Sequence, residues 1–123
     1  MSNFYIFTFL LLTLTSCNKN CKSVSEGTFR IESQVGNYTI VRSKNKQTEK
    51  VESTGVVSEY KIKWTSDCSY ILFDRKVIKG VDILHTKDTL YCTIIAVTGK
   101  EHKVRSYFKG HESAEFTLVK VTR

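Results

Sequence analysis

Residues 57–65 read VSEYKIKWT, and this stretch decides the fold class. Apolar and charged side chains alternate along it without interruption: Tyr60, Ile62 and Trp64 on one face, Glu59, Lys61 and Lys63 on the other. Side chains of a β-strand point alternately to the two faces of its sheet, so this alternation predicts an antiparallel strand with one dry and one wet face.

The same period of two continues through the rest of the chain and predicts about eight strands. The predicted ranges are 27–33, 37–42, 47–53, 57–65, 69–73, 90–97, 102–108 and 114–121. Short turn sequences such as Thr98-Gly99-Lys100 separate them. This spacing predicts an all-β antiparallel meander that closes into a small lipocalin-like barrel, with a β-sandwich as the alternative. Residues 47–53, polar apart from Val51, are predicted to form an exposed edge.

Composition limits the chain to one small globular domain. It has 123 residues, of which 41% are hydrophobic, and a net charge of +7, which excludes a disordered or fibrous protein. Residues 1–16, MSNFYIFTFLLLTLTS, contain no charged side chain. We therefore divide the chain into a signal peptide (1–16), a lipidated cysteine with its tether (17–26) and one all-β domain (27–123).

The apolar run FYIFTFLLLTL at residues 4–14 is too short to span a bilayer, which needs about 20 residues. Its length suits a secretory signal, although no Lys or Arg precedes it; a buried N-terminal strand is the alternative. The following Leu14-Thr15-Ser16-Cys17 resembles the lipobox of bacterial lipoproteins. That resemblance implies cleavage before Cys17 and attachment of diacylglycerol to its sulfur, with a further acyl chain on its amine. Two or more acyl chains hold a protein stably on a membrane.

The residues directly after Cys17 give an indication of where in the cell envelope the protein is located. By resemblance to enterobacterial sorting, Asn18 in place of Asp implies transport to the outer membrane. Surface-exposed lipoproteins of Bacteroidota often carry an acidic cluster here, and residues 18–23 contain no acid. We expect a protein of the cell envelope that faces the periplasm.

Three cysteines remain, so at most one disulfide forms within the chain. Cys92 lies in the apolar stretch LYCTIIAV, where a free cysteine behaves as a small hydrophobic residue. Cys21 lies on the tether and Cys68 in a predicted turn. We predict a Cys21–Cys68 disulfide, with Cys68–Cys92 as the alternative.

No residue pattern indicates catalysis, a metal or a cofactor. His85, His102 and His111 fall in different segments without ligand spacing, and no CxxC, HExxH, GxSxG or P-loop pattern is present. We expect a protein that is not an enzyme.

Basic residues gather in the second half of the domain. They are Lys61, Lys63, Arg75, Lys76, Lys79, Lys100, Lys103, Arg105 and Lys109. They form either a solvated surface or a face that attracts anionic lipid or lipopolysaccharide phosphates. Export from the cytoplasm argues against nucleic acid as a partner.

Four motifs stand out together: the lipobox, Cys21 with Gly27-Thr28-Phe29, Tyr38-Thr39-Ile40-Val41-Arg42, and Tyr60-Lys61-Ile62-Lys63-Trp64 followed by Asp67-Cys68-Ser69-Tyr70. With these motifs the chain resembles small uncharacterised lipoproteins of Bacteroidota, of the flavobacterial type. The resemblance implies one β domain, supports the Cys21–Cys68 pair and implies no established activity. Asp88-Thr89-Leu90 also resembles the O-glycosylation site of exported Bacteroidota proteins, with Thr89 as the acceptor.

Two functions follow as hypotheses. The first is a non-catalytic, membrane-anchored envelope lipoprotein that binds or supports envelope components. The second is a lipocalin-like carrier of a small apolar ligand.

Overall fold

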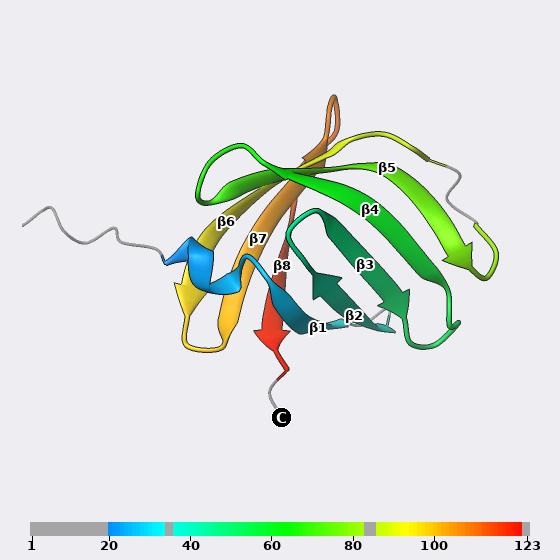
Figure 1. Cartoon of the computed structure of the whole chain (residues 1–123), viewed down its shortest axis with the longest axis horizontal. Helices are drawn as coiled ribbons and strands as arrows, with labels where there is room; N and C mark the ends of the chain where they lie inside the picture. Colours follow the sequence, from blue (N-terminus) through cyan, green and yellow to red (C-terminus); the bar gives the residue numbers. More distant parts are fainter. Residues whose placement is uncertain (1–19, 34–35, 83–85, 122–123) are drawn as a thin grey trace, which may run out of the picture.

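The computed structural model describes residues 20–33, 36–82 and 86–121 (Figure 1). The predicted signal peptide and the lipidation site Cys17 lie outside the described residues. One short 3-10 helix, η2 (Cys21–Val24), precedes the strands. These are β1 (Gly27–Ser33), β2 (Gly36–Arg42), β3 (Lys46–Val51), β4 (Val57–Trp64), β5 (Ser69–Lys79), β6 (Leu90–Thr98), β7 (Glu101–Phe108) and β8 (Ala114–Lys120).

The strands form a closed antiparallel barrel in chain order. Each strand pairs with the next, and β1 closes the circle on β8 through Phe29 opposite Lys120 and Arg30 opposite Val119. The predicted all-β meander barrel is confirmed, and the sandwich alternative is wrong. Strand β4 follows the predicted alternation, with Ile62 buried and Lys61 and Lys63 exposed.

The predicted exposed edge at residues 47–53 is wrong. Strand β3 pairs with β2 on one side and β4 on the other, so it has no free edge. The polar side chain of Gln47 is buried, 4% exposed, inside the barrel. Its polarity therefore reflects a polar patch of the barrel interior.

Strand β5 continues past its predicted end at Phe73 and carries a bulge near Asp74. Asp74 has a positive φ of 57°, and the register between β4 and β5 shifts between Glu59 and Lys61. One extra residue reverses the alternation that follows it. Arg75 consequently points inward and is only 6% exposed, so its assignment to a basic surface is wrong.

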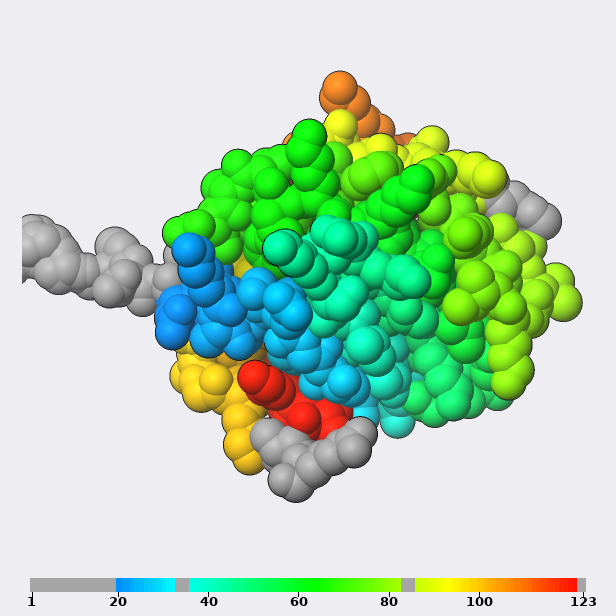
Figure 2. Space-filling model, viewed as in Figure 1, coloured from blue at the N-terminus to red at the C-terminus, as the bar shows by residue number. Residues whose placement is uncertain are grey.

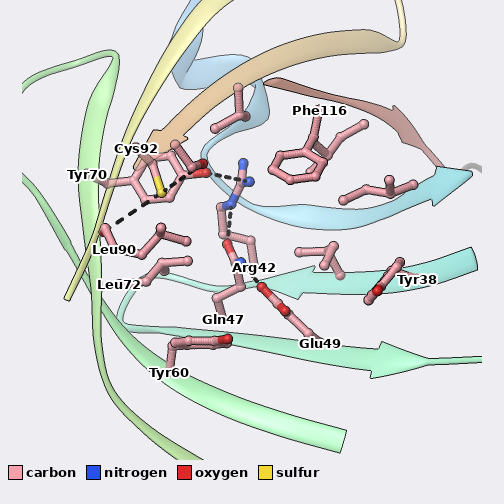
Figure 3. Close-up of a pocket in the computed structure, with 15 residues that line it drawn as sticks. Tyr38, Arg42, Gln47, Glu49, Tyr60, Tyr70, Leu72, Leu90, Cys92 and Phe116 are labelled. Carbon is pink, nitrogen blue, oxygen red and sulfur yellow. Dashed lines mark hydrogen bonds between the residues drawn. The ribbon is translucent and has the colours of Figure 1, made fainter. Parts of the chain in front are cut away.

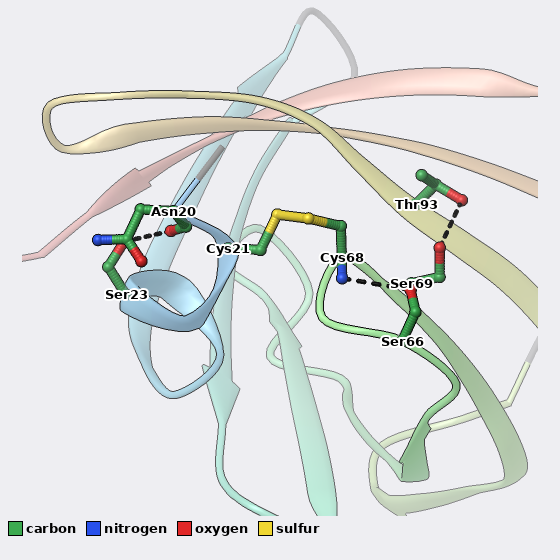
Figure 4. Close-up of a disulfide and its surroundings, with 7 residues drawn as sticks. All are labelled: Asn20, Cys21, Ser23, Ser66, Cys68, Ser69 and Thr93. Atoms are coloured by element: carbon green, nitrogen blue, oxygen red, sulfur yellow. Dashed lines mark hydrogen bonds between the residues drawn. A yellow bond between two sulfur atoms is a disulfide. The ribbon is translucent and has the colours of Figure 1, made fainter. Parts of the chain in front are cut away.

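A helix plugs one end of the barrel. Cys21 and Val24 of η2 are buried, 2% and 3% exposed, and the disulfide Cys21–Cys68 joins η2 to the β4–β5 turn with an S–S length of 2.05 Å (Figure 4). In Figure 2 the blue atoms of this segment lie between the green atoms around the β4–β5 turn and the gold atoms around the β6–β7 turn. We call this the plugged end, and the end bearing the β3–β4 and β7–β8 turns the open end.

The barrel is complete within residues 20–121. Its eight strands, its disulfide and its core all lie there. Phe29 and Ile94 have no exposed surface, and Leu72 is 2% exposed. The described residues therefore contain a closed sheet and a core of their own.

Candidate ligand-binding cavity

The barrel encloses a cavity of about 290 Å³. This volume lies at the lower end of the roughly 300–1,000 Å³ common for small-molecule sites. Most of its wall is apolar, formed by Ile31, Ile40, Leu72, Leu90, Val104, Phe116 and Leu118. The polar part of the wall comes from Tyr38, Arg42, Gln47, Glu49, Tyr60, Tyr70, Cys92 and Ser106.

The cavity has a floor at the plugged end and a mouth at the open end. Phe116 and Tyr38 both line the cavity toward the open end; Phe116 is 42% exposed and Tyr38 is half-buried (Figure 3). Arg42 and Tyr70, the lining residues nearest the plugged end, are 2% and 3% exposed. Access from solvent is therefore from the side opposite η2.

Arg42 organises the floor of the cavity. Its guanidinium donates to Oε1 of Gln47 at 3.1 Å, the carbonyl of Val24 at 2.7 Å, Nε2 of His102 at 3.3 Å and the hydroxyl of Tyr70 at 3.1 Å. It also lies 5.0 Å from the ring centre of Tyr70, at cation–π distance. Arg42 thus links β2 to β3, β5, β7 and the helical plug.

A short polar chain leads from Arg42 to the half-buried carboxyl group of Glu49 on the cavity wall. Gln47 accepts from Arg42 and donates from Nε2 to Glu49 at 3.1 Å (Figure 3). Burial raises the pKa of Glu49 above its usual value of 4.5, while the hydrogen bond from Gln47 and the charges of Arg75 and Arg42 lower it in part. The neutral acid of Glu49 is therefore favoured relative to the same group in water.

Burial disfavours ionisation of three further groups of the wall, Cys92, Tyr60 and Tyr70. Burial raises the pKa of the Cys92 thiol to about 11, and Ser106 donates to its sulfur at 3.5 Å. A thiol with so high a pKa is a poor nucleophile at neutral pH. Burial also raises the pKa of Tyr60 and of Tyr70, which keeps both phenols neutral.

His102 lies behind the floor and is 1% exposed. Arg42 can only donate, so the Nε2 atom of His102 accepts and the proton sits on Nδ1, which has no partner among the described residues. Burial, together with the charge of Arg42, lowers the pKa of His102 to about 4. The imidazole is consequently neutral at neutral pH.

This gives a prediction for acid stability. The unfolded chain binds a proton at His102 near its usual pKa of 6.5 and the folded chain only near 4, so His102 lowers stability as pH falls between these values. Between pH 7.5 and 4.5 we expect the native domain to lose about 2 kcal/mol more of its free energy of unfolding than His102→Gln, measured by urea denaturation. Gln retains an acceptor for Arg42 without titrating, and Glu49, whose raised pKa acts in the opposite direction, is common to both proteins. Equal losses would contradict the assignment.

The sequence-predicted sites fall in three groups. The Cys21–Cys68 disulfide is confirmed, and Cys92 is free and buried, so the Cys68–Cys92 alternative is wrong. Thr89 is half-buried directly before β6, and its glycosylation stays a prediction. Cys17 and His85 lie outside the described residues.

The basic residues expected on the surface are mostly exposed, but several are paired with acids. Lys61 contacts Asp74 at 2.8 Å, and Arg105 contacts Glu115 at 2.8 Å. Arg75 is buried against Asp82 at 3.1 Å. These pairs reduce the positive charge available to an anionic surface, whose binding stays a prediction.

The polar floor was missed at the sequence level, although the alternation carried a signal for it. In residues 37–42 a period of two that puts the apolar Tyr38 and Ile40 on the inward face places Arg42 there as well. In β3 the inward position of Val51 likewise places Glu49 and Gln47 inside. Their polar character led to the opposite interpretation.

Comparisons with known proteins do not identify the site. In residues 20–33, 36–82 and 86–121, His, Cys, Asp and Glu side chains form no group of three that could hold a metal. No helix in this part of the chain is long and apolar enough to cross a membrane. No protein-family model matches the chain, and no curated protein or solved structure matches it significantly.

Proposed function

We propose that this protein is a lipid-anchored binding protein of the cell envelope whose barrel holds one small, mostly apolar molecule. The proposal joins the two hypotheses drawn from the sequence. The barrel acts as the carrier, and the acylated Cys17 keeps it at the outer membrane, facing the periplasm.

The cavity is the observation that carries the proposal. Protein interiors are normally filled to the density of organic crystals, and empty space costs stability because the lining atoms lose their contacts. A volume of about 290 Å³, close to that of ten water molecules in the liquid, lies behind a largely apolar wall. Water gains little there, whereas an apolar guest gains about 25 cal/mol for each Å² of apolar surface it buries.

The position of the disulfide supports an orientation for the anchored protein. Cys17 precedes Cys21 by four residues, a span of at most about 14 Å in an extended chain. The disulfide fixes Cys21 to the plugged end. A lipid on Cys17 would therefore hold the plugged end near the bilayer and turn the mouth toward the aqueous compartment, so that ligands exchange with that compartment.

The anchor has its own test. We expect an alkyne-tagged palmitate fed to the cells to label the native protein, and Cys17→Ala to lose the label and leave the membrane fraction. Equal labelling of the two proteins would contradict acylation at Cys17. This result is independent of whether the cavity binds anything.

Ligand binding in the cavity is tested with a substitution that blocks the cavity entrance. Leu90 lines the cavity and is half-buried, so Leu90→Trp should occupy the entrance. We expect calorimetric titration of residues 18–123 with 1-decanol to show one site, and Leu90→Trp to weaken binding at least ten-fold. Val41→Trp is the matched control because Val41 points outward and is 45% exposed; it should bind like the native domain. Thermal melting establishes that each variant is folded, and unchanged binding by a folded Leu90→Trp domain would contradict the proposal.

A further inference from the structure

Arg42 is a buried cation whose direct partners are all neutral. It is 2% exposed, and it forms no ion pair with a described residue. Its four hydrogen bonds go to an amide oxygen, a backbone carbonyl, an imidazole and a phenol. A charge removed from water with no opposite charge beside it is costly, and the cost falls when an anion binds next to it.

The guanidinium also has an unused donor. Arginine carries five N–H groups, and the four hydrogen bonds occupy Nε, both hydrogens of Nη1 and one hydrogen of Nη2. The second Nη2 hydrogen has no partner among the described residues. Arg42 lines the cavity, and Figure 3 shows its guanidinium among the lining side chains at the floor.

The apolar part of the wall suits the tail of an amphiphile. Leu72 lies beside the floor, and Leu90, Ile31 and Phe116 continue the apolar wall to the mouth. A ligand with its head on Arg42 would therefore have its tail along these side chains. Arginine is the residue best suited to bind a carboxylate, since its planar N–H groups match the two oxygens.

We propose that the cavity selects small amphiphiles with a carboxylate head, which pairs with Arg42 while the alkyl or aryl tail extends toward Phe116. This inference rests on the proposed binding function and names its ligand class. Glu49, the acid among the described lining residues, is separated from Arg42 by Gln47. Burial raises the pKa of Glu49, which disfavours the carboxylate form that would compete with a ligand for Arg42.

The test compares decanoate with 1-decanol, which share a chain length and differ in charge. Both are titrated at pH 7.5 into residues 18–123, a segment that contains the complete barrel. We expect decanoate to bind at least ten-fold more tightly than 1-decanol. If 1-decanol binds as tightly or more tightly, the carboxylate inference is overturned and the binding function stands; if neither binds, the proposed function itself fails.

Gln47→Glu provides the decisive variant. Oε1 of Gln47 lies 3.1 Å from Nε of Arg42, so a carboxylate of the same size supplies the missing counterion from within the protein. We expect Gln47→Glu to abolish the preference for decanoate over 1-decanol. Thr117→Glu is the control, since it adds the same charge on the exposed side of β8 opposite Lys103; it should keep the preference. A folded Gln47→Glu domain that still prefers decanoate ten-fold would overturn the inference.

Discussion

Arg42→Met is expected to lower the free energy of unfolding by about 3 kcal/mol. The substitution leaves the carbonyl of Val24 and the hydroxyl of Tyr70 without their donor at a buried site, and each such loss costs about 1–3 kcal/mol. Removal of a buried charge returns part of this cost. Urea denaturation at pH 7.5 measures the difference from the native domain.

Arg105→Met is the matched control. Arg105 also donates twice, to Glu115 at 2.8 and 3.1 Å, but its side chain is 51% exposed. Exposed pairs of this kind contribute about 0–1 kcal/mol, so we expect a loss in that range. If the two variants lost equal stability, Arg42 would not be the centre of the floor that the hydrogen bonds indicate.

Loss of the disulfide is expected to have the largest effect on stability. Cys21 and Cys68 are 47 residues apart, and the chain-entropy model gives about 4 kcal/mol for closing a loop of that length. The double variant Cys21→Ala/Cys68→Ala should lose about this amount. It should also lose rigidity at the floor, because Val24 of η2 is a direct partner of Arg42.

A reducing agent distinguishes the stability contributed by the disulfide from changes in side-chain packing caused by the substitutions. The native domain and Cys92→Ala, which retains the disulfide, should both lose stability on reduction, whereas the double variant should not respond. Melting curves with and without dithiothreitol measure the response. A native domain that is insensitive to complete reduction of its disulfide would contradict the prediction.

The positions of the strands and their inward faces were predictable because local alternation determines them. In residues 57–65 the inward and outward sets separate cleanly, and β4 has that arrangement in the barrel. The closure of the barrel was harder to predict from the sequence. It depends on the pairing of Phe29 with Lys120, which joins the two ends of the domain and produces no pattern within either segment. The barrel was chosen over the sandwich only because it removes exposed edges.

The site was harder to predict than the fold for a physical reason. A polar residue on the inward face of a strand breaks the very pattern by which that face is recognised, as at Gln47 in β3. Arg75 shows a second cause, since the bulge at Asp74 reverses the faces partway along β5. Both departures occur inside the barrel, where hydrogen-bond partners from other strands compensate for the buried polar groups.

Native mass spectrometry tests whether a ligand occupies the barrel in the cell. The protein is extracted from its own membranes with no lipid added. We expect a single additional mass of one small acidic molecule per chain, which is released on denaturation and is missing from a folded Leu90→Trp protein. A chain that carries its acyl anchor and nothing else, and that also fails to take up decanoate or 1-decanol, would contradict the account.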